Sequence, residues 1–120
     1  MMKSIVCDTP GSLRMERRPM PVPADGEVLL RIRRIGICGT DMHIFRGTQP
    51  FLSYPRVMGH ELSGHIHSAP AGSRLAMGDQ VYVMPYLSCG TCVACRQGKT
   101  NCCTRIEVLG VHRDGGMSEY

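Results

Sequence analysis

The stretch GEVLLRIRRIGIC, residues 26–38, decides how the first half of the chain is interpreted. Its side chains follow a period of two, which is typical of a half-buried β-strand. The parity changes at Arg33 and Arg34, where a β-bulge is the simplest explanation, and bulges often re-aim side chains near functional sites. One face is formed by Val28, Leu30 and Ile32, and the other by Leu29, Arg31 and Arg33.

Shorter patterns of the same kind surround this strand, whereas helical patterns are scarce. Residues 88–105 are rich in cysteine and poor in apolar side chains, which predicts a loop. The sequence therefore predicts a mainly β fold with short helices. We expect strands over 3–7, 13–18, 59–68 and 78–85, a short strand in the tail, and a helix with Thr40 or Asp41 as its N-cap that ends at Gly47.

The composition fits one small domain: the chain has 120 residues, of which 42% are hydrophobic. The net charge is +4, from 14 basic and 10 acidic residues. The arginines are interrupted by apolar residues and are not interleaved with aromatic ones, so we expect them on solvated strand faces and expect no nucleic-acid partner.

The sequence has no apolar run of about 18 residues, the length that a transmembrane helix needs, so we expect no membrane partner. The N-terminal residues lack the apolar stretch of a signal peptide, which predicts a cytoplasmic protein. Seven cysteines in that compartment would stay reduced, which favours metal binding over disulfides.

Five cysteines lie in residues 88–105, and four of them follow one another at spacings of three, three and eight positions. Four thiolates are the ligand set of a closed, structural zinc site. Cys102, next to Cys103, leaves the identity of the fourth ligand open. The alternative to a zinc site is a thiol redox cluster or a disulfide, although redox dithiols usually accompany a βαβ pattern that is absent here. The predicted ligands are Cys89, Cys92, Cys95 and Cys103.

A second group combines a cysteine, a histidine and a carboxylate from two separated segments. These are the ligand types of a catalytic zinc that keeps one coordination position open. The first segment contains Cys38, Thr40, Asp41 and His43, and the second contains His60 and Glu61.

Four runs of sequence closely resemble the N-terminal part of zinc-dependent medium-chain dehydrogenases, the superfamily of alcohol, sorbitol and threonine dehydrogenases. They are GICGTDMHIFRG, YPRVMGHELSG, GDQVYVMPYLSCGTCVACRQGKTNCC and VLGVHRDGGMSEY. The resemblance covers nearly the whole chain and is greatest to bacterial enzymes that oxidise sugar acids, such as galactonate or gulonate 5-dehydrogenases. It implies a GroES-like, partly open β-barrel, with residues 1–120 as an incomplete N-terminal catalytic domain that contains the zinc loop 88–105.

The resemblance also implies roles for individual residues. Cys38 and His60 become ligands of the catalytic zinc, and Glu61 becomes a direct ligand or a carboxylate near the metal. The strand pattern after His60 points Glu61 the opposite way, which favours indirect or intermittent contact. Thr40 would hydrogen-bond the substrate oxygen, His43 would pass the alcohol proton to solvent, and Asp41 would orient a ligand imidazole.

The implied enzyme binds two zinc ions and NAD or NADP, is a homo-oligomer, and oxidises a small-molecule alcohol, polyol or sugar acid by hydride transfer. No GxGxxG motif follows a strand in these 120 residues, so we predict no cofactor-binding residues in this chain. A Rossmann domain and a further zinc ligand would lie elsewhere. The isolated chain is therefore expected to be inactive, and the alternative is a non-catalytic, zinc-binding GroES-like structural fragment.

Overall fold

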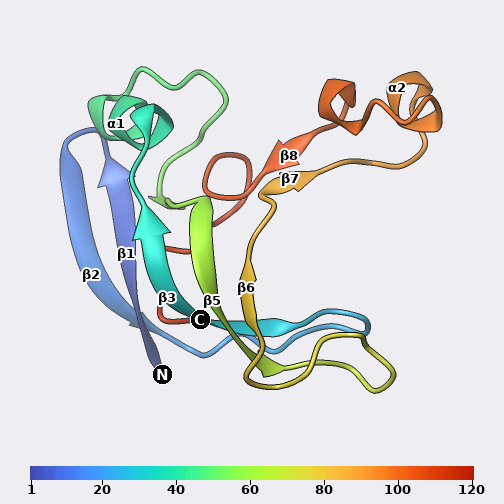
Figure 1. The fold of residues 1–120 in the computed structure, drawn as a ribbon. Helices are drawn as coiled ribbons and strands as arrows, with labels where there is room; N and C mark the ends of the chain where they lie inside the picture. Colours follow the sequence, from blue (N-terminus) through green and yellow to red (C-terminus); the bar gives the residue numbers. More distant parts are fainter.

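The computed structural model describes all 120 residues, as two three-stranded sheets and a projecting arm (Figure 1). Strands outnumber helices, so the predicted mainly β class is confirmed. The strands are β1 (Met2–Thr9), β2 (Ser12–Arg18), β3 (Leu29–Gly36), β4 (Arg56–Val57), β5 (Glu61–Ser68), β6 (Gln80–Tyr82), β7 (Tyr86–Leu87) and β8 (Glu107–Val108). The helices are α1 (Gly39–Arg46), α2 (Val93–Arg96) and the 3₁₀ helix η1 (Thr100–Cys102).

The two sheets are antiparallel and have the strand orders β2-β1-β4 and β3-β5-β6. The register between β3 and β5 shifts between Ile32 and Arg34, which confirms the predicted bulge. Gly64 lies opposite Ile32, and a Cβ at this glycine would collide with the carbonyl oxygen of Arg31. The glycine therefore permits the close approach of the two strands beside the bulge.

The C-terminal residues connect the two sheets. The Ile5 N–H donates to the Met117 carbonyl at 2.8 Å, and the Ile32 N–H donates to the Glu119 carbonyl at 2.9 Å. The Ser118 hydroxyl also donates to Ser4 Oγ at 2.8 Å. The segment 117–119 thus lies between β1 and β3, so that the two sheets form one curved wall, with the C-terminus beside β3 and β5 in Figure 1.

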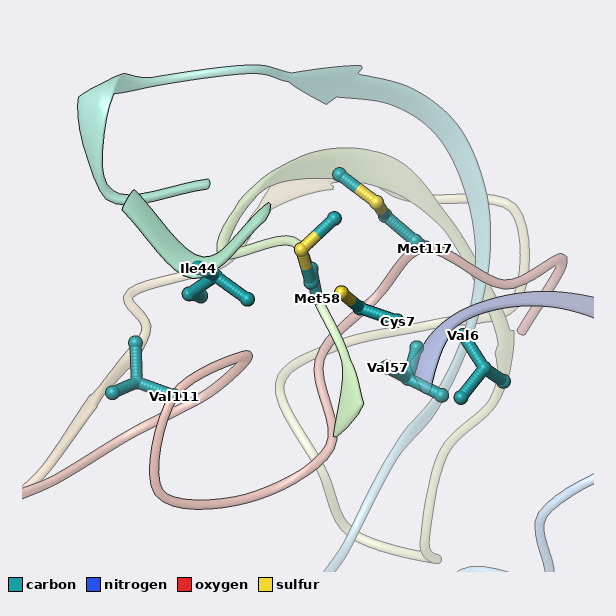
Figure 2. Packing of buried hydrophobic residues seen from close by; sticks show 7 residues of the cluster. All are labelled: Val6, Cys7, Ile44, Val57, Met58, Val111 and Met117. Carbon is teal, nitrogen blue, oxygen red and sulfur yellow. The ribbon is translucent and has the colours of Figure 1, made fainter. Parts of the chain in front are cut away.

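The hydrophobic core is small and draws on segments from the whole length of the chain. In Figure 2, the sulfur-bearing side chains of Met58 and Cys7 lie between Ile44 and Val57, and the side chain of Met117 lies above them. Cys7 is fully buried, as predicted for a small core residue. The complete cluster consists of Val6, Cys7, Ile44, Val57, Met58, Val111 and Met117.

The helix prediction was wrong at its start, because the N-cap of α1 is Cys38 and not Thr40 or Asp41. Asp41 occupies the third helical position, where its Oδ2 accepts the Cys38 N–H at 2.9 Å. Such a reciprocal arrangement satisfies a free donor at the helix start. The predicted end at Gly47 is confirmed by its left-handed φ of 78°.

Two other predictions differ from the structure. The strand expected over residues 78–85 is only three residues long, as β6, while the segment 88–105 contains α2 and η1 in place of an irregular loop. The thiol of Cys92 accepts the Cys95 N–H at 3.5 Å and so caps α2, a role that sequence patterns seldom assign to cysteine. No helix has the length and apolar character needed to cross a bilayer.

Asp114 fastens the last turn of the chain to β2 and β4. Its carboxylate accepts the Val57 N–H at 3.0 Å and the Arg18 guanidinium at 2.8 Å, and it lies 3.3 Å from Arg56. Burial alone would raise the pKa of this carboxyl, but the Val57 and Arg18 donors together bring the pKa below its ordinary value of 3.8.

Asp114→Asn should lower the thermal unfolding midpoint at pH 7 by a few degrees. A carboxylate with a depressed folded-state pKa contributes stability above its unfolded pKa, and this contribution is lost as the pH falls through the folded value. The difference between variant and parent should therefore shrink below about pH 3.8. Thermal melts at pH 7 and pH 3 measure the difference in unfolding midpoint between the variant and the parent. The control is Asp25→Asn, which changes an exposed aspartate. The same difference at both pH values would contradict the electrostatic explanation.

Candidate metal centres

The first candidate centre begins where β3 leads into α1. Cys38 is the N-cap of this helix, which places its thiol at the helix start, and the hydrogen bond from its own N–H to Asp41 fixes both residues. Asp41 and Ile44 are three residues apart and form the buried face of α1. The helix is thereby anchored with Cys38 at the edge of the core.

His60 reaches the same place from the segment before β5. This segment is held by the C-terminal turn, since the Gly115, Gly116 and Met117 N–H groups donate to carbonyls of residues 57–59 at 2.7–2.9 Å. His60 Nε2 lies 3.1 Å from Cys38 Sγ, although the two residues are 22 positions apart. The fold thus brings together the two predicted ligands.

The surroundings of His60 and Asp41 fit a metal centre. Asp41 Oδ1 and His60 Nδ1 are buried and have no hydrogen-bond partner, and 4.0 Å separates them. Buried polar atoms without partners are costly unless a ligand or ion completes the site. One ligand atom from each of Cys38, Asp41 and His60 lies within 4.8 Å of the others, which suits a divalent ion with sulfur, nitrogen and oxygen ligands.

The other residues predicted for this centre lie around it. Glu61 is exposed and outside the group, and its carboxylate lies against Gly36 at the end of β3. Thr40 and His43 are three residues apart on α1 and so share a face of the helix. His43 is exposed, and its Nδ1 lies 2.9 Å from Thr48 Oγ1.

The second candidate centre lies in the arm formed by β7, α2, η1 and β8, which projects from the sheets in Figure 1. The four predicted thiols lie within 4.8 Å of one another, and Cys89 Sγ is 4.0 Å from Cys95 Sγ. A tetrahedron with zinc–sulfur bonds of about 2.3 Å needs sulfur–sulfur distances of roughly 3.8 Å, so the group is close to that geometry.

Cys103, and not Cys102, completes this group. Cys103 is buried with its Sγ among the other three thiols, whereas Cys102 is exposed and outside the group. Backbone N–H groups also point at the sulfurs: Cys89 and Arg105 donate to Cys103 Sγ at 3.3 and 3.4 Å. All seven cysteines are free, so the structure contains no disulfide.

These N–H donors shift the thiol pKa values in different directions. The Thr91 and Cys92 N–H groups lower the pKa of Cys89 to about 5, and the Cys95 N–H group lowers the pKa of Cys92 to about 7. Burial raises the pKa of Cys95 to about 11. Cys89 is therefore a thiolate at neutral pH, which is the form that binds zinc.

Arg105 is a candidate functional residue that the sequence patterns did not indicate. Its guanidinium donates to Thr91 Oγ1 at 2.7 Å and lies beside the Cys89 thiolate, which raises the pKa of the arginine. A cation here offsets part of the negative charge of four thiolates. Its position two residues after the last ligand was the available signal.

The chain matches the family model of the alcohol dehydrogenase GroES-like domain over residues 24–120. It is 49% identical over 120 residues to L-galactonate-5-dehydrogenase of Escherichia coli K12, and the match covers 99% of this chain and 35% of that protein. The chain thus spans about a third of the length of the curated relatives it matches.

Solved structures of similar proteins share the fold. An alcohol dehydrogenase of E. coli CFT073 in complex with NADH is 48% identical with a TM-score of 0.89, and the match covers 98% of this chain and 34% of that one. A zinc-binding dehydrogenase of Sinorhizobium meliloti 1021 bound to NADP is 35% identical with a TM-score of 0.90, over 100% of this chain and 35% of that one.

The chain therefore belongs to the GroES-like domain family of the zinc-type alcohol dehydrogenases. The predicted fold class is confirmed. The roles of the individual site residues remain predictions.

Cys95→Ser should abolish zinc retention in the arm and lower the zinc content by one ion per chain. The variant leaves only three thiolates, whereas a closed structural site requires four ligands. Cys102→Ser is the matched control, since it removes a neighbouring thiol that lies outside the group. Metal analysis together with a count of protected thiols measures both variants. Equal zinc loss in the two variants would contradict the assignment of Cys103 as the fourth ligand.

Proposed function

We propose that residues 1–120 form the zinc-binding catalytic portion of an NAD(P)-dependent dehydrogenase. The substrate would be a small alcohol, polyol or sugar acid, a class supported by the similarity to L-galactonate-5-dehydrogenase. The proposal depends on one observation above all: Cys38 Sγ lies 3.1 Å from His60 Nε2, beside two buried polar atoms that lack partners.

In this proposal Cys38 and His60 hold the catalytic zinc. Zinc, when bound, supplies a Lewis acid that makes the substrate hydroxyl more acidic. Asp41 Oδ1 lies 4.0 Å from His60 Nδ1, and a closer approach of the two atoms would let the carboxylate orient the imidazole with Nε2 toward the metal. Glu61, outside the group here, would approach the metal only after its side chain leaves Gly36.

The proton would leave along α1. The Thr40 hydroxyl would take the proton of the substrate hydroxyl and give up its own proton. His43, on the same helix face, would receive that proton and release it to water. His43 is exposed, as this last step requires, and the contact between its Nδ1 and Thr48 leaves Nε2 free to exchange the proton.

The hydride acceptor would bind to a nucleotide-binding domain that these 120 residues do not include. With Asp41 orienting His60, this chain would supply two zinc ligands at this centre, Cys38 and His60, so a further ligand from outside these 120 residues would complete it. We propose that residues 1–120 alone are inactive. The seven free thiols support a cytoplasmic location, because oxidising compartments favour disulfides.

A non-catalytic zinc-binding fragment is the second candidate. The four-thiol group supports it, because that group is complete within the chain while the group at Cys38 has three candidate ligands at most. Residues 1–120 would then bind one zinc ion per chain for structural purposes only.

A chimera would test the catalytic proposal. Residues 1–120 would be joined to the remaining two thirds of L-galactonate-5-dehydrogenase, and oxidation of L-galactonate would be followed by NADH absorbance. We expect Cys38→Ser to lower kcat/KM at least about a hundred-fold, since a catalytic Lewis acid contributes several kcal/mol. The arm should keep its zinc ion.

Cys102→Ser in the same chimera is the matched control and should leave turnover unchanged. Full activity of the Cys38→Ser chimera would contradict the proposed role of this cysteine. Oxidation of the substrate by residues 1–120 alone would contradict the need for a second domain.

A further inference from the structure

A small polar pocket lies on the second sheet, where β3, β5 and β6 are neighbours (Figure 1). Its volume is about 220 Å³, and no apolar side chain lines it. It shares no residue with the group formed by Cys38, Asp41 and His60 or with the four thiols. The lining residues are Arg33, Arg34, Ser63, Gly64, His65 and Gln80.

The β-bulge explains how two consecutive arginines line one pocket. Side chains of neighbouring residues in a regular strand point to opposite faces. Here Ile32 pairs with Gly64 and Arg34 pairs with Ser63, which leaves Arg33 as the extra residue of β3. The extra residue changes the direction of the strand, so that Arg33 and Arg34 can face the same space.

Neither arginine has a carboxylate partner. No ion pair in the structure includes Arg33 or Arg34, whereas four other arginines each form at least one: Arg14, Arg18, Arg56 and Arg113. The only hydrogen bond of the Arg34 guanidinium is to the Arg33 carbonyl, at 2.9 Å. No acidic residue lines this pocket, and Glu61, which borders an adjoining pocket with Arg34, lies against Gly36.

We propose that this pocket binds a small oxyanion of the phosphate type, either free phosphate or the phosphoryl group of a small metabolite. Two guanidinium groups offer the forked donors that bind phosphate oxygens in pairs. The Ser63 hydroxyl, the Gln80 amide and the His65 ring add further donors around the same space. The volume is below the roughly 300–1,000 Å³ of pockets for drug-sized ligands, which favours an ion of this size.

Titration of the 120-residue chain with inorganic phosphate tests the proposal. Ionic strength is held constant with sodium chloride, and binding is followed by NMR shifts of backbone amides. We expect saturable shifts at residues 63–65 and 80. Arg33→Gln and Arg34→Gln should each weaken binding at least about ten-fold, which is the scale of one lost charge-assisted hydrogen bond.

Two further variants distinguish a built pocket from a merely basic surface. Arg31→Gln removes the same charge from the same strand but does not line the pocket, so it should change the affinity less than two-fold. Arg34→Lys keeps the positive charge but loses the paired N–H donors of the guanidinium group, so its affinity for phosphate should lie between those of the parent and Arg34→Gln. Equal losses for Arg31→Gln and Arg34→Gln would overturn the proposal.

Two other ligands complete the test. Glucose 6-phosphate that binds more tightly than inorganic phosphate would identify the phosphoryl group of a metabolite as the source, and the reverse order would identify free phosphate. A response to the polyanion heparin without any response to inorganic phosphate would overturn the proposal. Because none of these measurements uses catalysis or zinc, the result is independent of the proposed dehydrogenase function.

Discussion

The close backbone crossing between residues 57–60 and the C-terminal turn is the constraint on which the rest of the structure depends. Three N–H groups of the turn donate to carbonyls of this segment, and Asp114 accepts the Val57 N–H. A Cβ at Gly110 would lie 2.8 Å from Gly59 N, so only glycine allows the chains to come this close. The crossing holds His60 in place and buries Met58 and Met117 together.

The two candidate metal centres depend on different physical causes. The group at Cys38 exists because α1 and the segment before β5 pack into one core through Ile44 and Met58, so its geometry is a tertiary property. The four-thiol group belongs to a short arm in which Cys103 is the only buried residue of positions 88–105. Such a segment has little hydrophobic stabilisation of its own, so metal binding and folding of the arm should be coupled.

Local patterns predicted several features correctly. The parity change at Arg33 indicated the bulge, and the isolated Gly47 indicated the end of α1, because both signals depend only on neighbouring residues. The start of α1 was missed because a cysteine is an unusual N-cap and Asp41 acts from the third helical position. The polar pocket was also missed, since its lining comes from three strands that only the folded sheet brings together.

The sequence by itself determined the chemistry available to this protein: the spacing of four thiols in one loop, the Cys38 and His60 pair, and the mainly β pattern. These are properties of residue type and local spacing, which the unfolded chain already contains. Tertiary structure decided which atoms meet. It placed Cys103 and not Cys102 among the thiols, moved Glu61 away from Cys38, and directed two arginines into one pocket. The positions of Glu61 and of the two arginines depend on strand register and backbone approach between distant segments, which local spacing does not encode. The selection of Cys103 depends on how the arm itself folds.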